Sequence, residues 1–207
     1  MRFDPCQRVA ITACLLWAAA CGGPAPRIAD EHSAPTAPPA RVAVAATPTL
    51  VTIMEVSAAG EVTGGGEVPK MALADEEWRE RLTPLGFSVT RKKATELAFT
   101  GRYDKHYEPG IYRCAACNTA LFHSSTKFDS RTGWPSFSAP AAAANVYTET
   151  DDSGGMLRDE VLCRRCDGHL GHVFPGGPEP AGLRYCINSA ALRFEAAAGA
   201  SEGGGAR

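Results

Sequence analysis

Apolar residues follow two different periods along the chain, and the change of period divides the sequence. After Asp75, the apolar residues Trp78, Leu82 and Leu85 recur at the spacing of an amphipathic helix. Asp75 is a suitable N-cap for this helix, and Pro84 is expected to end it. The pattern therefore predicts a short helical region at the start of the ordered part.

Beyond Gly101 the apolar positions come instead in short runs separated by glycine, proline, asparagine and aspartate. These runs are predicted as short strands, at residues 111–115, 119–122, 145–150, 160–163, 169–174 and 184–194. Short strands joined by turn residues indicate antiparallel sheets. The sequence therefore predicts a mainly β domain over residues 71–195, with the helical region at its N-terminal end.

The chain on either side of this domain has no such period. Residues 22–48 are rich in proline and alanine and cannot bury enough apolar surface to offset the entropy lost on ordering. Residues 49–70 begin with a small apolar patch and end in three glycines, so a short strand is an alternative there. We favour a largely disordered linker over the whole of 22–70, and a disordered tail over 196–207.

The N-terminal segment 1–21 combines a basic start, an apolar stretch from Val9 to Ala20, and small residues before Cys21. The apolar stretch is too short for a membrane span, and the pattern is typical of a secretory signal. Small residues directly before Cys21 resemble a bacterial lipoprotein signal, in which the cysteine is acylated. A plain cleaved signal and an uncleaved anchor are the alternatives. We expect an exported, lipid-anchored protein of the bacterial periplasm or cell envelope.

Composition narrows the range of partners. Lys and Arg number 21 against 23 Asp and Glu, which gives a net charge of -2. The chain therefore has no overall positive field, and its composition does not indicate binding to nucleic acid or to anionic lipid. Contact with a membrane is expected only through the N-terminal anchor.

Four of the 8 cysteines form two Cys-x-x-Cys pairs, Cys114 with Cys117 and Cys163 with Cys166. Four thiolates satisfy a tetrahedral Zn²⁺ completely and leave no open position for water, so such a site is structural. One zinc ion per chain would staple the two segments together. The alternatives are two disulfides, which an oxidising compartment favours, and redox activity within one pair.

Cys186 stands apart from these pairs. If its surroundings form a strand, Arg184, Cys186 and Asn188 share one face, and Tyr185 and Ile187 point to the other and anchor the strand. A thiol held between a cation and an amide on a rigid support is typical of a reactive cysteine. A buried, inert cysteine is the alternative.

Two histidines and a tryptophan supply further chemistry. His169 and His172 would point to opposite faces of a regular strand, but Gly168 and Gly171 permit a bulge that brings both rings to one side. An imidazole near a thiol can favour the thiolate and can deliver a proton. Satisfied polar groups or extra metal ligands are the alternative. Trp134 could form a wall for a thioether methyl group or a packed corner of the core.

Taken together, the paired Cys-x-x-Cys motifs and the segments GWPSF (133–137), HLGHVF (169–174) and GLRYCINSAALRF (182–194) closely resemble methionine sulfoxide reductase type B. The similarity runs from about Asp75 to Glu195. It implies reduction of the R-sulfoxide of methionine in proteins and peptides, on a mainly β fold with a zinc ion away from the active site. It also implies a monomer, a thioredoxin-like or other thiol reductant, and a role in repairing oxidised proteins.

Carried over by position, the resemblance makes Cys186 the nucleophile, which attacks the sulfoxide sulfur and becomes a sulfenic acid. The resemblance implies that His169 and His172 deliver the proton and that Trp134 and Phe174 contact the substrate. It also implies that Arg184 and Asn188 orient the thiol.

This chain departs from the family pattern at two positions. Thr132 stands where many members carry a resolving cysteine just before GWPSF. No other thiol of the ordered domain is left to resolve Cys186, so we predict a one-cysteine cycle with an external thiol. Gly176 stands where an aspartate is usual, and the lost carboxylate bears on how a histidine is oriented.

Two other classes of function stay open from the sequence. A zinc-ribbon binding module without chemistry would need a basic or aromatic stripe and would be indifferent to Cys186→Ser. A thiol–disulfide oxidoreductase would use the Cys-x-x-Cys pairs and would contain no zinc.

Overall fold

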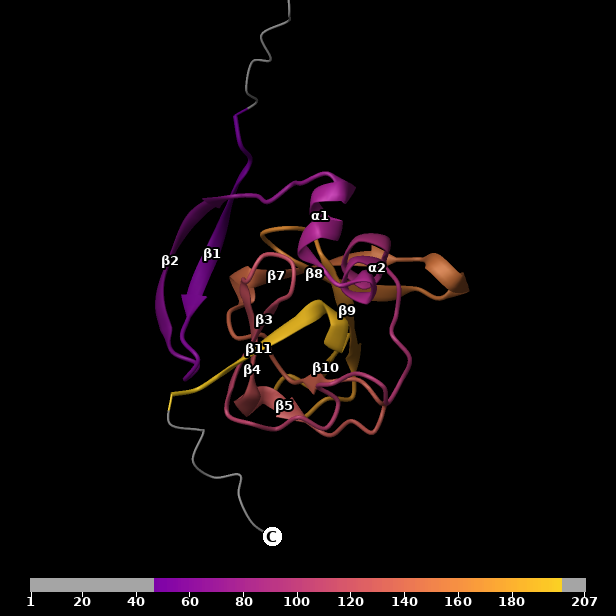
Figure 1. The fold of residues 1–207 in the computed structure, drawn as a ribbon. Coiled ribbons are helices and arrows are strands. Elements are labelled where there is room, and N and C mark those ends of the chain that lie inside the picture. The colour runs from indigo at the N-terminus through magenta and orange to yellow at the C-terminus, as the bar shows by residue number, and fades with distance from the viewer. Residues whose placement is uncertain (1–46, 199–207) are drawn as a thin grey trace, which may run out of the picture. The chain divides into compact units, whose positions relative to one another are not determined.

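A computed structural model of the chain describes residues 47–198 (Figure 1). The expected signal at 1–21 with Cys21 lies outside the described residues, as do most of the Pro/Ala-rich stretch and the tail from 199 onward. Within residues 47–198, no helix is long and apolar enough to cross a membrane.

The described part is mainly β, as predicted, with two short helices before the main sheets (Figure 1). The helices are α1 (Asp75–Arg81) and α2 (Pro84–Lys92). The strands are β1 (Leu50–Val56), β2 (Val62–Pro69), β3 (Gly110–Cys114), β4 (Ala120–His123), β5 (Lys127–Phe128), β6 (Ser136–Phe137), β7 (Val146–Asp151), β8 (Arg158–Cys163), β9 (His169–Pro175), β10 (Leu183–Ile187) and β11 (Leu192–Ala196). All pairings are antiparallel within three sheets, ordered β1-β2, β5-β6-β10-β9-β8-β7 and β11-β3-β4.

The helical region differs from the prediction at both of its marked residues. Asp75 is not the N-cap: Ala74 holds that place with extended backbone, and its N–H donates to Oε2 of Glu77 at 3.0 Å. Pro84 does not simply end a helix but begins α2, where its missing N–H costs nothing. Thr83 caps α2, because its Oγ1 accepts the Gly86 N–H at 3.0 Å.

Residues 50–69 form the hairpin β1–β2, so the expectation of a linker over this stretch is wrong. Ile53 and Val56 of β1 are buried. The buried side chain of Asn145 holds the strand from the other side: its Oδ1 accepts the Met54 N–H, and its Nδ2 donates to the carbonyls of Met54 and Ala120, each at 2.8 Å. The partner that orders β1 lies 91 residues away in sequence, which local patterning does not reveal.

The predicted strand 184–194 is two strands in different sheets. β10 ends at Ile187, a single turn of 3-10 helix (Ser189–Ala191) follows, and β11 continues in the three-stranded sheet. The Asn188 N–H donates to the Leu170 carbonyl at 2.8 Å, which ties the end of β10 to β9. This change of sheet places one face of β10 against the aromatic core and leaves the other face for a site.

Candidate active site

Six residues predicted for the site line one cleft of about 280 Å³: Trp134, His172, Phe174, Arg184, Cys186 and Asn188. The alternation predicted for β10 is confirmed, because Ile187 is fully buried and Tyr185 packs against Phe122 with ring centroids 5.7 Å apart. The cleft-facing side of β10 therefore carries the thiol between a cation and an amide.

A bulge in β9 brings the two histidines together, as the glycines suggested. In the pairing with β8, Val161 lies opposite Gly171 and Leu162 opposite His169, so β9 carries one extra residue at this point. The ring centroids of His169 and His172 consequently lie 5.4 Å apart. Gly171 is also required by the neighbouring strand, because a Cβ placed there would overlap the carbonyl oxygen of Cys186.

The surroundings of Cys186 favour the protonated form of its thiol. Burial raises the pKa of the Cys186 thiol, and the Thr132 hydroxyl and the Arg184 charge oppose this without cancelling it. The Thr132 Oγ1 lies 3.9 Å from the Cys186 Sγ. Arg184 itself stacks over the ring of Phe174, with its guanidinium carbon 4.8 Å from the ring centroid. The basic neighbour expected to favour the thiolate is thus outweighed by desolvation.

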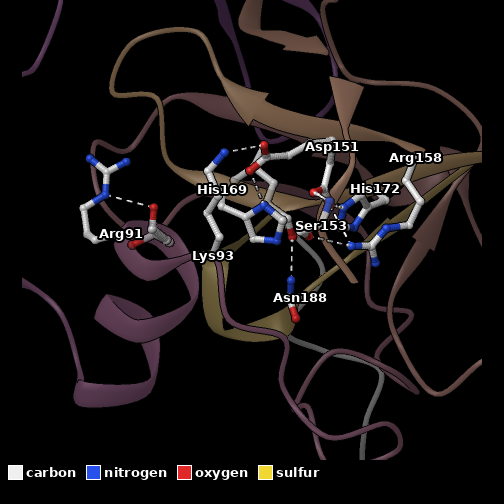
Figure 2. A network of polar contacts seen from close by, with 11 residues as sticks. Arg91, Lys93, Asp151, Ser153, Arg158, His169, His172 and Asn188 are labelled. Atoms are coloured by element: carbon white, nitrogen blue, oxygen red, sulfur yellow. Dashed lines mark hydrogen bonds and ion pairs between the residues drawn. The ribbon is translucent and has the colours of Figure 1, made fainter. Parts of the chain in front are cut away.

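His172 is held by a carboxylate that the sequence analysis did not single out. Its Nε2 lies 2.7 Å from Oδ2 of Asp151, at the end of β7 (Figure 2). Arg158 donates to the same oxygen from 2.7 Å, and the Ser153 N–H donates to Oδ1 from 2.9 Å. Arg158 also lines the cleft. The only sequence signal was position, since Asp151 follows directly on the predicted strand 145–150.

His169 belongs to a second, buried pair (Figure 2). Its Nδ1 lies 2.7 Å from Oε1 of Glu160, and the Lys93 Nζ donates to the other oxygen of that carboxylate, also at 2.7 Å. Burial lowers the pKa of His169, although Glu160 opposes the shift. Its Nε2 has no hydrogen-bond partner among the described residues. His169 does not line the cleft, so any contribution to proton delivery passes through its neighbours.

Trp134 and Asn188 are fixed by the segment that follows α2. The Trp134 Nε1 donates to the Glu96 carbonyl at 3.1 Å, and the Glu96 N–H donates to the Asn188 Oδ1 at 3.0 Å. Asn188 in turn donates from Nδ2 to the Leu170 carbonyl at 3.0 Å. The buried Glu96 carboxylate accepts the Ser189 N–H at 2.6 Å. The amide of Asn188 is therefore engaged with backbone and holds the end of β10.

The four remaining described cysteines form a separate, buried cluster. Their sulfur atoms all lie within 4.8 Å of one another, with Cys114 and Cys166 at 3.7 Å and Cys117 and Cys163 at 3.4 Å. These distances exclude disulfides among the described cysteines, because an S–S bond is about 2.05 Å long. They match the edges of a tetrahedron of sulfur atoms about 2.3 Å from a central metal ion. The donor set therefore fits a thiophilic metal.

A residue with left-handed backbone conformation follows each Cys-x-x-Cys pair and closes a tight turn. Asn118, with φ 64°, follows the first pair and donates its N–H to the Cys114 carbonyl at 2.9 Å. Asp167, with φ 53°, does the same for Cys163 at 2.9 Å. The left-handed residue of the second turn, Asp167, directly precedes Gly168, and the four sulfurs of the two turns converge.

Comparison with known proteins places these features in a family. Residues 82–196 match the family model described as the SelR domain. The chain is 55% identical to the peptide methionine sulfoxide reductase MsrB of Bradyrhizobium diazoefficiens over 126 residues, which covers 61% of this chain and 91% of that protein. It is 57% identical to the protein of the same name from Thiobacillus denitrificans over 120 residues, covering 58% and 91% respectively. For the Leptospira interrogans protein of that name the figures are 52% over 122 residues, 59% and 93%.

Proposed function

The chain belongs to the SelR-domain family, the peptide methionine sulfoxide reductases of type B, and from this premise we propose that it reduces methionine R-sulfoxide in oxidised proteins with Cys186 as its nucleophile. One observation carries the assignment to this thiol. Cys186 is the cysteine that lines a cleft with an imidazole, a guanidinium and two aromatic rings. The other described cysteines are buried in a cluster of their own.

The chemical step exchanges one oxygen between two sulfurs. The Cys186 sulfur attacks the sulfoxide sulfur while the sulfoxide oxygen takes up a proton. The S–O bond of the substrate then breaks, the oxygen passes to Cys186, and methionine leaves. A thiol and a sulfoxide become a sulfenic acid and a thioether, so the cysteine loses the two electrons that the substrate gains. The thiol proton replaces the one delivered to the oxygen, and no net proton is consumed.

The cleft supplies a distinct group for each part of this step. His172 lies across the strand pair from Cys186 and is placed to carry the proton, with His169 behind it as a buried neighbour. Trp134 and Phe174 offer aromatic surface to the methyl group and side chain of the sulfoxide. Arg184 places a positive charge beside the thiol, and Asn188 fixes the strand that carries it.

We propose that the cycle uses one cysteine. The side chains that approach the Cys186 Sγ are Thr132, Ser136 and Arg184, none of which can form a disulfide. The sulfenic acid would therefore react with an external thiol, giving water and a mixed disulfide. A second thiol then releases Cys186 in its reduced form. A thioredoxin-like protein or a small thiol could provide both.

We assign the four-cysteine cluster to one structural zinc ion. Four buried sulfurs from two tight turns fill a tetrahedral coordination sphere and leave no position for a substrate or water. The ion would fix the ends of β3 and β8 and take no part in the reaction. This reading disfavours a thiol–disulfide oxidoreductase built on either pair.

The test of the function is an assay on the two epimers of a methionine sulfoxide peptide, with dithiothreitol as reductant. We expect turnover of the R epimer only, abolished by Cys186→Ser and retained by the matched control Thr132→Ser. Turnover of the S epimer, or equal activity in Cys186→Ser, would overturn the assignment. Substrate added without reductant should leave Cys186 reactive to dimedone, whereas a disulfide between Cys186 and another cysteine of the chain would refute the one-cysteine cycle.

We further propose that residues 1–21 direct export and that Cys21 receives the lipid, because small residues precede it after a short apolar stretch. The enzyme would then repair methionines of exported proteins from the membrane surface. Labelling of cells with a radioactive fatty acid should mark the intact protein and leave Cys21→Ala unmarked. Equal labelling of both, or of neither, would contradict acylation at this residue.

A further inference from the structure

We propose that Asp151 is the positioning residue for His172: it holds the ring so that Nε2 carries the proton and Nδ1 is the nitrogen left to serve the reaction. The inference rests on the proposed function of the cleft and adds a residue to it. Gly176 has no carboxylate that could orient this histidine, and Asp151 reaches the ring from β7.

The hydrogen bonds around Asp151 determine which nitrogen is protonated. Its Oδ1 accepts the Ser153 N–H at 2.9 Å, and its Oδ2 accepts from Arg158 Nη2 at 2.7 Å. Hydrogen bonding from Ser153, and then from His172, holds the pKa of Asp151 well below its usual range. The carboxylate is therefore ionised at neutral pH and can only accept hydrogen bonds. A ring nitrogen 2.7 Å from it must be an N–H.

The Nδ1 atom of His172 can accept a proton, and the Cys186 thiol has one to give. With the proton of the neutral ring form on Nε2, Nδ1 is the nitrogen that can take a proton. Cys186 lies directly across the strand pair from His172, and burial keeps its thiol protonated. His172 and Cys186 line the same cleft, so this ring is the base that we assign to receive the thiol proton as the sulfur attacks and to pass it to the sulfoxide oxygen. The negative Asp151 stabilises the imidazolium between these two events.

The two histidines are held by opposite ring nitrogens. Glu160 holds His169 by Nδ1, the opposite ring nitrogen, and it is shared with Lys93 from the segment after α2. Other groups around His172 come from β8, β9 and β10, and they are Arg158, Glu160, His169, Arg184 and Cys186. Among the described residues, Asp151 is the carboxylate within hydrogen-bond distance of the His172 ring.

The kinetic test compares two neighbouring aspartates in the full-length, metal-loaded protein. Asp151→Asn keeps the shape but places an amide where both oxygens receive N–H donors, so the group loses its charge and one of its acceptor contacts. We expect kcat for the R-sulfoxide peptide to fall about tenfold to hundredfold, with KM changed less than about twofold. The matched control is Asp152→Asn at the exposed neighbour, which should retain the wild-type kcat.

A spectroscopic test reads the ring directly and needs no substrate. Nitrogen NMR of the resting enzyme, with the His172 signals identified by their loss in His172→Asn, should show the proton on Nε2 in the wild type. The Asp151→Asn variant should show a mixture of ring protonation states with an unchanged metal content. Proton on Nδ1 in the wild type, or an unchanged ring and kcat in Asp151→Asn, would overturn the inference. Failure of the proposed function would appear separately, as R-sulfoxide turnover that survives Cys186→Ser.

Discussion

The five described cysteines occupy two regions that treat the same side chain in opposite ways. In the four-cysteine cluster each sulfur has other sulfurs beside it, with separations of 3.4 and 3.7 Å for two of the pairs, and the residues are at most 6% exposed. The Thr119 hydroxyl, 3.2 Å from the Cys117 Sγ, is another polar contact of the cluster. Around Cys186 the neighbours are a hydroxyl, a guanidinium and aromatic rings at the wall of a cleft. The neighbours, more than the thiol itself, decide whether a cysteine binds a metal or attacks a substrate.

The backbone settings of the two regions explain this division. The cluster is carried by tight turns at the ends of β3 and β8, where left-handed residues fold each pair around a point. Cys186 lies inside β10, between β9 and β6, and its carbonyl lies against Gly171. A turn lets several sulfurs converge, whereas a central strand isolates one sulfur and fixes its direction.

The largest effect should come from breaking the cluster. Cys163→Ser removes one of four buried ligands, and a structural metal contributes its binding free energy to folding. We expect loss of bound zinc and a fall in the free energy of unfolding of at least about 4 kcal/mol. Metal analysis and urea unfolding measure both quantities.

The matched control for this experiment is Cys186→Ser. Because Cys186 lies in the cleft and outside the cluster, its replacement should leave zinc bound and change the free energy of unfolding by less than about 1 kcal/mol. A Cys163→Ser protein that keeps its metal and its stability would contradict the division between the two regions.

Sequence patterning predicted the two regions well because each is built from local spacing. The pairs at Cys114 and Cys163 sit at the knuckle spacing of metal sites, and the alternation around Cys186 follows from a strand with one buried face. Five predicted strands recur with ends shifted by at most two residues. Strands of two residues, β5 and β6, were missed because no period can be detected over so short a length.

What the sequence could not supply were partners distant along the chain. Asn145 orders β1 from 91 residues away, and Asp151 reaches His172 across β8. Glu96, 38 residues before Trp134, accepts its indole N–H. Each is a polar residue whose role depends on sheet order and on the change of sheet after Ile187. The order of the strands in a sheet cannot be deduced from composition or from the periodicity of apolar residues.

The next largest effect is expected from placing a second cysteine beside Cys186. Thr132→Cys places a second sulfur where a hydroxyl now lies 3.9 Å from the Cys186 Sγ, so that a small movement of the two side chains would bring the sulfurs to bonding distance. We expect substrate without reductant to produce a disulfide between positions 132 and 186 and to abolish the dimedone adduct. Peptide mapping and thiol counting measure both, with Thr132→Ser as the control. Persistence of the adduct would mean that the two side chains cannot meet during the cycle.

The smallest effect concerns the charge state of Cys186. Burial raises the pKa of this thiol and Arg184 opposes the rise, so Arg184→Met should raise it further and leave less thiolate at any pH below it. We expect alkylation of Cys186 by iodoacetamide at pH 8 to slow about threefold in this variant, with the difference closing as pH rises, because the thiolate is the form that reacts. In the control Arg193→Met, at an exposed position on β11, Cys186 should be alkylated at the wild-type rate. The four-cysteine cluster should stay unmodified in all three proteins. Faster alkylation after loss of Arg184 would show that its guanidinium shields the sulfur more than it stabilises the thiolate, which would remove the electrostatic part of the contrast between the two regions.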